Sequence, residues 1–177
     1  MTKKTSTVFI FFICCISIIT TYSCSKEKGA IGTDEGTDAK LYEMAKETNG
    51  FTWFGNSSAL LNKSSGSGHP QPFLRTRYNS VAATKLDVNG KIISGSVFPQ
   101  GSLIVKELYL DSSTLGRYAI LYKKSTSGNA DANGWVWGYI NPDGSVAEPA
   151  SKKGVSCIGC HSQSGSIDYM LMNKFFP

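Results

Sequence analysis

Cysteines, histidines and long apolar runs are all scarce in this chain of 177 residues, which has five cysteines and two histidines. The apolar run over residues 8–19 covers about a dozen positions, whereas a helix that spans a membrane needs about 20. The sequence has no internal repeat, which argues against a solenoid or a propeller. The length therefore predicts a single globular domain.

The charge balance gives no sign of a nucleic-acid-binding protein. The formal net charge is +5, and Lys3 and Lys4 contribute two of these charges within a targeting segment rather than within the domain. We therefore expect no nucleic-acid partner. The hydrophobic fraction of 41% is ordinary, so the domain can bury a core without disulfide staples.

The first 24 residues are typical of a bacterial export signal. Two lysines, the apolar run and a stretch of small or polar residues follow one another up to Cys24. This end resembles a lipoprotein signal, in which Cys24 becomes the lipidated first residue, although Thr21 and Tyr22 depart from the usual pattern. The alternative is cleavage by an ordinary signal peptidase, which would leave Cys24 as a free thiol.

These features predict three parts. Residues 1–24 form the signal, residues 25–40 form a flexible tether with several glycines and charges, and residues 41–177 form the folded domain. We expect a protein that is exported by a bacterium and anchored by lipid to a membrane, facing the periplasm or the cell surface. Cys14 and Cys15 would leave with the signal, so only the last two cysteines would remain in the domain.

The residue patterns predict an α+β fold, a β-rich antiparallel sheet with a few helices. Apolar residues recur at helical spacing near residue 41, and β-branched and aliphatic residues dominate from residue 102 onward. The predicted helices cover residues 38–49 and a short segment from 79 to 86. The predicted strands cover residues 73–78, 102–110, 118–123 and 135–140. Turns are predicted at residues 87–90 and 141–144, and polar loops at 62–68 and 128–134.

The strongest chemical signal is the pentad Cys157-Ile158-Gly159-Cys160-His161. Two thiols at this spacing can reach the two vinyl groups of one haem, and the next residue then places an imidazole at the iron. The pentad predicts one covalently bound haem c, attached through Cys157 and Cys160, with His161 as an axial ligand of the iron. Export supports this interpretation, because such attachment occurs outside the bacterial cytoplasm.

Three other interpretations of the two cysteines remain open. A thioredoxin-type redox pair would begin a helix inside a βαβ unit, and too little chain follows Cys160 for that unit. A structural zinc site needs four ligands, and His69 is the only other histidine that could join one. A plain disulfide between Cys157 and Cys160 is the third.

The position of the pentad near the C-terminus bears on the second axial ligand. Met170 and Met172 follow the pentad closely and would have to wrap around to the opposite face of the haem, so we interpret them as core residues. The distal face then lacks an obvious protein ligand. An open iron position suits the binding of small molecules or redox chemistry on them.

A second segment with a recognisable pattern lies upstream of the pentad, at Phe98-Pro99-Gln100-Gly101-Ser102-Leu103-Ile104-Val105-Lys106-Glu107-Leu108. It is similar to the Phe-x-x-Gly-Thr-x-x-x-Lys-Glu segment of the cytochrome P-460 family. The pentad, followed by Asp168 and the closing residues 173–177, resembles the family's haem motif and its final Phe-Tyr-Pro. The segment around Arg75 is a weaker match. The resemblance covers roughly residues 41–177.

The resemblance implies a β-rich haem domain, often a homodimer, that oxidises hydroxylamine or binds and processes nitric oxide. It also implies a lysine that is covalently linked to the porphyrin edge, and Lys106 holds that position. It makes Arg75 a candidate for the haem pocket. A sister group, the β-type cytochromes c-prime, shares the fold, lacks the cross-link and binds gases such as nitric oxide.

The residues themselves give a partial test of this resemblance. In a strand, Ile104, Lys106, Leu108 and Leu110 share one face, and a lysine there either reaches water or reacts. Hydroxylamine-oxidising members carry a distal glutamate, and a simple alignment puts Tyr122 at that position, so Tyr122 is the candidate distal residue. Trp135, Trp137 and Tyr139 share one face of their strand and belong either to the pocket or to the core.

Three functions follow from these features. The first is a redox enzyme that acts on hydroxylamine or nitric oxide and exchanges electrons with a partner protein. The second is a haem protein that binds nitric oxide without turnover. The third is a simple electron carrier. Lys106 favours the first two, and the missing glutamate favours the second over the first.

Overall fold

The structure is a computed structural model that describes residues 36–177. The predicted signal, the lipidation at Cys24 and most of the predicted tether lie outside the described residues. Within residues 36–177, no helix has the length and apolar character needed to cross a membrane.

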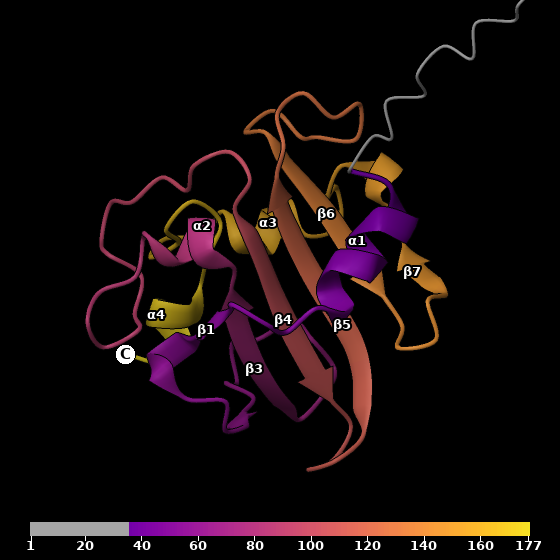
Figure 1. Ribbon diagram of the computed structural model, residues 1–177. Coiled ribbons are helices and arrows are strands. Elements are labelled where there is room, and N and C mark those ends of the chain that lie inside the picture. The colour runs from indigo at the N-terminus through magenta and orange to yellow at the C-terminus, as the bar shows by residue number, and fades with distance from the viewer. Residues whose placement is uncertain (1–35) are drawn as a thin grey trace, which may run out of the picture. The chain divides into compact units, whose positions relative to one another are not determined.

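A seven-stranded antiparallel sheet dominates the fold, which is α+β as the sequence predicts (Figure 1). Its strands follow the order β1-β3-β4-β5-β6-β7, and β2 pairs with β3 beside β1. The strands are β1 (Thr52–Trp53), β2 (Leu61–Asn62), β3 (Phe73–Tyr78), β4 (Leu103–Tyr109), β5 (Leu115–Lys123), β6 (Trp135–Ile140) and β7 (Val146–Glu148).

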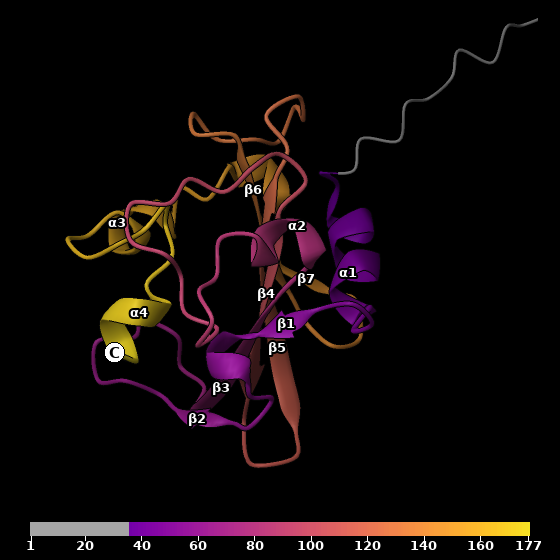
Figure 2. The same ribbon diagram turned by 60° about the vertical axis from the view of Figure 1, so that its left-hand side comes forward.

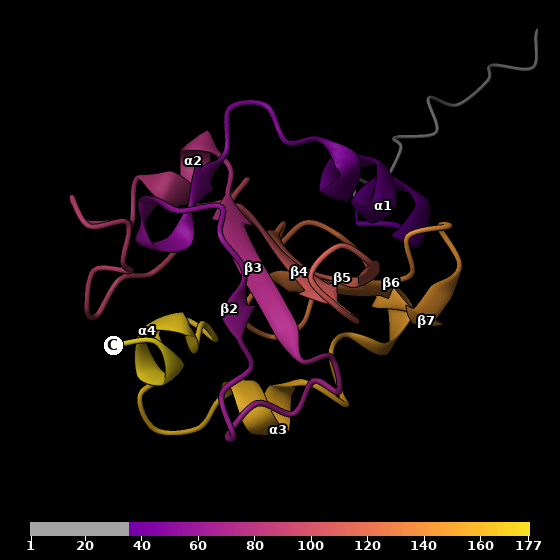
Figure 3. The ribbon, with the colours of Figure 1, turned by 90° about the horizontal axis from the view of Figure 1, so that it is seen from below.

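Short helices lie on both faces of this sheet. The helix α1 covers one face, whereas α3 and α4 lie over the other (Figures 2 and 3). The α-helices are α1 (Asp38–Lys46), α2 (Ser80–Ala83), α3 (Ile158–His161) and α4 (Met172–Phe175), and two 3-10 turns are η1 (Phe54–Asn56) and η2 (Ala150–Lys152).

Local chemistry sets the ends of the helices. The Thr37 side chain accepts a hydrogen bond from the Lys40 amide at 3.3 Å and caps the start of α1. The Glu47 carboxylate accepts from the amides of Thr48 and Asn49, both at 2.8 Å, and α1 therefore ends before residue 49. The Asn79 side chain accepts from the Ala82 amide at 2.9 Å and starts α2, as the sequence predicts.

The alternation of side chains along the central strands builds two apolar clusters, one on each face. On the face that α1 covers, Leu41 and Ala45 of this helix pack on residues of β4, β5 and β6 such as Val105, Ile120 and Ile140. The opposite cluster is larger and mostly aromatic or aliphatic. Its fully or nearly fully buried members include Leu74, Tyr78, Phe98, Ile104, Leu108, Trp135, Met170 and Met172.

The predicted strands are confirmed with small changes at their ends. β3 and β6 have the predicted bounds, β4 is shorter by one residue at each end, and β5 begins at Leu115 rather than at residue 118. The turn at residues 141–144 is confirmed, because the Gly144 amide donates to the Asn141 carbonyl at 2.9 Å. The sequence did not predict β1, β2, β7, α3 or α4, each of four residues or fewer.

Candidate functional site

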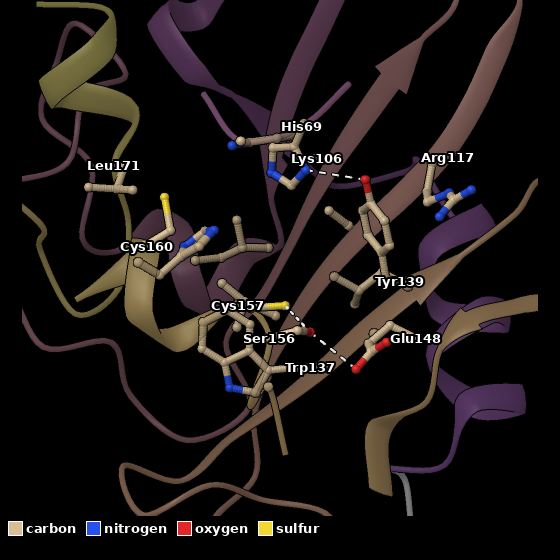
Figure 4. A pocket seen from close by; sticks show the side chains of 18 of the residues that line it. His69, Lys106, Arg117, Trp137, Tyr139, Glu148, Ser156, Cys157, Cys160 and Leu171 are labelled. Atoms are coloured by element: carbon tan, nitrogen blue, oxygen red, sulfur yellow. Dashed lines mark hydrogen bonds between the residues drawn. The ribbon is translucent and has the colours of Figure 1, made fainter. Parts of the chain in front are cut away.

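A cavity of about 380 Å³ lies on the face of the sheet opposite α1. Residues of β3 to β6 form one side of it, and α3, α4 and the loop before β3 form the other (Figure 4). Both histidines of the chain and both cysteines of the pentad line this cavity. A pocket of this size suits a small-molecule or cofactor ligand, for which about 300–1,000 Å³ is typical.

Gly154 starts the segment that presents the two cysteines. It has φ +70°, and its carbonyl accepts hydrogen bonds from the amides of Cys157 at 2.8 Å and Ile158 at 2.9 Å. A Cβ atom at this position would lie 2.5 Å from Cγ of Trp137. Only glycine combines this backbone conformation with such close packing on the indole, so Gly154 sets where α3 begins.

His161 closes α3 and points into the cavity with a defined tautomer. Its Nδ1 lies 2.7 Å from the Tyr169 carbonyl oxygen, which can only accept, so Nδ1 carries the proton. Trp137 packs edge-on against the imidazole, with ring centres 5.3 Å apart. Burial and the nearby Lys106 lower the pKa of His161 to about 4. The ring is therefore neutral near pH 7, with the lone pair of Nε2 available to a metal.

A carboxylate that is largely shielded from solvent fixes the turn that holds His161. Asp168 and Tyr169 both have positive φ values, 45° and 71°. The Asp168 carboxylate accepts from the amide of Phe98 at 2.9 Å, from Nε1 of Trp135 at 2.9 Å and from Nζ of Lys123 at 3.2 Å. These bonds hold the backbone in a conformation that non-glycine residues seldom adopt and so aim the Tyr169 carbonyl at His161.

The two cysteines are free thiols in this structure. Cys157 is half-buried, Cys160 is exposed, and burial raises the pKa of the Cys157 thiol. Ser156, beside Cys157, donates to Glu148 at 3.1 Å. Among residues 36–177, no group of three or more histidine, cysteine or acidic side chains is arranged to hold a metal ion, so the zinc interpretation gains no support.

Lys106 lies on the floor of the cavity, in the middle of β4. It is in register with Thr76 on β3 and with Ala119 on β5, and all three line the cavity. Burial lowers the pKa of Lys106 to about 8, although Cys160 opposes this shift. A substantial fraction of the amine is therefore neutral near pH 8. Leu110 does not share its environment, because it lies beyond the end of β4 and is 57% exposed.

The sequence prediction did not include Arg117 and named His69 only for zinc, yet both line the cavity. Arg117 stacks on the ring of Tyr139, with its guanidinium carbon 4.5 Å from the ring centre, and its buried Nε has no hydrogen-bond partner. His69 Nδ1 lies 3.3 Å from the Tyr139 hydroxyl, the contact marked in Figure 4. Arg117 could have been found from its alternation with Ala119 and Leu121 on one face of β5.

The structure places Tyr122 and Arg75 on the side of the sheet opposite to the cavity, which corrects their prediction as pocket residues. Lys106 pairs with Ala119, so Ala119 and the residues that alternate with it on β5, Arg117 and Leu121, lie on the cavity face, whereas Tyr122 packs in the cluster beneath α1. Arg75 pairs with Glu107, which points away from Lys106, and donates to its carboxylate. Neither residue lines the cavity, so the prediction that they belong to the haem pocket is wrong.

The aromatic and methionine candidates divide between cavity and core. Trp137 and Tyr139 line the cavity, whereas Trp135 is fully buried beneath it. Met170 and Met172 are core residues as predicted, and both also border the cavity. The Met172 sulfur accepts a hydrogen bond from Thr76 at 3.3 Å.

Comparison with known proteins identifies no relative of this chain. No protein-family model, no curated protein and no solved structure matches the chain significantly.

Proposed function

We propose that this chain is an exported, lipid-anchored cytochrome that binds a single haem c in the cavity and carries out redox chemistry on hydroxylamine or nitric oxide. The observation that carries the proposal is the donor set: two free thiols at haem-attachment spacing and a neutral imidazole border the same apolar cavity. Export and lipid attachment follow from the signal that ends at Cys24, and the P-460-like character from the resemblance.

The residues of the cavity fit such a group. Cys157 and Cys160 would hold it through thioethers, and Nε2 of His161 would bind its iron. Arg117, with a buried and unpaired Nε at the cavity, suits a propionate carboxylate. When bound, the haem supplies an iron centre that takes up and releases single electrons and binds small ligands.

Lys106 is the residue that supports the P-460-like part of this proposal. Its amine lies in the cavity rather than in solvent, in the strand position that the resemblance assigns to the cross-linking lysine. Because burial lowers its pKa to about 8, the neutral amine is accessible for bond formation. The bond replaces one N–H and one ring C–H and releases two protons and two electrons. Hydrogen peroxide, added to the matured protein before its spectrum is recorded, accepts both and becomes two water molecules.

The test compares the spectra of fully matured protein and of Lys106→Ala, each with covalent haem verified. The proposal predicts a red-shifted, broad ferrous Soret band in the unmutated protein and an ordinary c-type spectrum in Lys106→Ala. It also predicts a branched haem peptide that contains Lys106, and oxidation of hydroxylamine that is lost in the variant. Identical spectra without the branched peptide would refute the P-460 assignment and leave the haem site standing.

A second function, binding of nitric oxide without turnover, is favoured because the one carboxylate among the described residues that line the cavity is already engaged in other hydrogen bonds. Of the described residues that line it, Glu148 is the acidic one, and its carboxylate already accepts from Ser156 at 3.1 Å and from Lys152 at 3.4 Å. Hydroxylamine oxidation needs a proton acceptor, whereas gas binding does not. Nitric oxide binding without hydroxylamine turnover would select this function, and inertness toward both would select a simple electron carrier.

A further inference from the structure

The loop between β2 and β3 brings a second imidazole to the haem-binding cavity. The chain has two histidines, 92 positions apart in sequence (161 − 69), and their ring centres lie 6.4 Å apart with an interplanar angle of 73°. His69 is half-buried, although the residues on both sides of it are exposed. The burial of His69 is unusual, because a histidine in a Ser/Gly loop would ordinarily turn its polar ring to water.

The two histidines are held in the same way. Nδ1 of His161 lies 2.7 Å from the Tyr169 carbonyl, and Nδ1 of His69 lies 3.3 Å from the Tyr139 hydroxyl. Within residues 36–177, neither Nε2 atom takes part in a hydrogen bond. A metal-binding histidine is typically held in this manner, with one ring nitrogen bonded to a protein oxygen and the other left for the metal.

The spacing of the rings also matches a shared metal. Two imidazoles on opposite sides of one metal, with metal–nitrogen bonds of about 2 Å, have ring centres roughly 6 Å apart. The observed 6.4 Å agrees with this separation. The two methionines at the cavity are less suitable, because the Met172 sulfur is engaged by Thr76 and Met170 follows His161 closely along the chain.

The backbone around His69 supports a defined position. Pro70 restricts the preceding residue to extended conformations, which limits how His69 can turn. Gly66, in the same loop, lies so close to α4 that a Cβ atom there would be 2.7 Å from Cε1 of Phe175. The Lys63 amide donates to the Pro72 carbonyl at 2.7 Å and closes the loop at its base. The loop is thus held over the cavity rather than extended into solvent.

We infer that His69 is the sixth ligand of the haem iron, opposite His161, in the absence of a small molecule. The inference rests on the proposed haem site and adds a regulatory step to it: an incoming ligand has to displace His69 from the iron. Gly68, next to His69, leaves room for this displacement because a Cβ atom there would meet nothing within 4 Å, whereas Gly66 stays packed on Phe175.

The test uses matured holoprotein and measures spin state by electron paramagnetic resonance and optical spectroscopy. Unmutated ferric protein should be six-coordinate and low-spin, whereas His69→Ala should be high-spin, and added imidazole should restore the low-spin signal. Ferrous His69→Ala should bind carbon monoxide at least about tenfold more tightly, because no imidazole has to be displaced. Ser65→Ala, an exposed change in the same loop, should match the unmutated protein.

The outcomes separate this inference from the haem site itself. Covalent haem with a high-spin ferric signal that His69→Ala leaves unchanged would overturn the ligation and keep the proposed function. A low-spin signal that persists in His69→Ala without imidazole would also overturn it, because another group would then bind the iron. Absence of covalent haem in every variant, including Ser65→Ala, would refute the proposed function and the ligation with it.

Discussion

The carboxylate of Asp168 offers the sharpest test of how the fold holds its site. Asp168 and Lys123 form an ion pair at 3.2 Å whose side chains are only 11% and 7% exposed. Asp168→Asn keeps the size of the side chain and its tolerance of positive φ, but its single amide oxygen can replace only one of the two carboxylate oxygens, so one of the bonds from the Phe98 amide and Trp135 Nε1 is kept and the other is lost. The change therefore removes the charge and leaves Lys123 buried without a counter-ion.

The expected loss follows from that uncompensated charge. Breaking a buried ion pair by removing one partner costs about 3–5 kcal/mol, a large part of the roughly 5–15 kcal/mol that stabilises a typical domain. Replacing both partners by neutral groups is much less costly. Lys123→Met combined with Asp168→Asn should therefore unfold at a higher denaturant concentration than Asp168→Asn alone.

Denaturant unfolding of the single and double variants measures the coupling between the two residues. The ion pair predicts a coupling free energy of at least about 1.5 kcal/mol. A loss below about 1 kcal/mol in Asp168→Asn, or strictly additive losses in the double variant, would refute the argument that this carboxylate clamps the turn at residues 168–169. In the holoprotein, Asp168→Asn should also alter the spectrum, since the Tyr169 carbonyl orients His161.

Two further perturbations probe the same site. Gly154→Ala should lower the free energy of unfolding by about 2–4 kcal/mol, because it forces alanine into positive φ against Trp137, whereas Gly159→Ala, whose Cβ meets nothing within 4 Å, should be near neutral; equal losses would contradict this. The folded-state pKa values of His69 and His161, about 3 and about 4, lie below the ordinary 6.5, so the unfolded chain binds more protons below pH 6.5 and the stability of haem-free protein should fall as pH drops toward 4. His69→Gln should reduce that slope by about 1.4 kcal/mol per pH unit, and an unchanged slope in urea titrations would show that His69 is not buried as a neutral ring.

Much of the fold could be predicted because its central strands carry clear patterns. β3 and β6 had the predicted bounds, since aromatic residues stand at both ends of β3, aromatic and β-branched residues make up most of β6, and turn residues follow β6. β1, β2 and β7 are two or three residues long, too short for an alternation to be recognised. α3 was not predicted as a helix, because its start depends on the carbonyl and the positive φ of Gly154 rather than on helix propensity.

The site was predictable where its residues are adjacent in sequence and not where they meet across the sheet. The pentad and Lys106 carry local signals, and the structure brings them to one cavity. Tyr122 was misplaced because a shift of one residue between β4 and β5 turns a side chain to the other face, and register is not written in either strand alone. His69 reaches the cavity through the packing of a loop, which no local pattern predicts. Arg117 alternates with Ala119 and Leu121, but it lies before residue 118, where the sequence-predicted strand began.

The central claim is that Cys157 and Cys160 hold one haem c, and the intact mass of mature protein tests it most directly. Protein produced in bacteria with the periplasmic haem-attachment machinery should exceed the mass of its polypeptide and lipid by one haem. Its haem should stay bound through denaturing electrophoresis and acid-organic extraction. Cys157→Ala combined with Cys160→Ala should lack the added mass. Mature protein that carries no added haem mass, or whose haem is extracted by acid and solvent, would contradict the account.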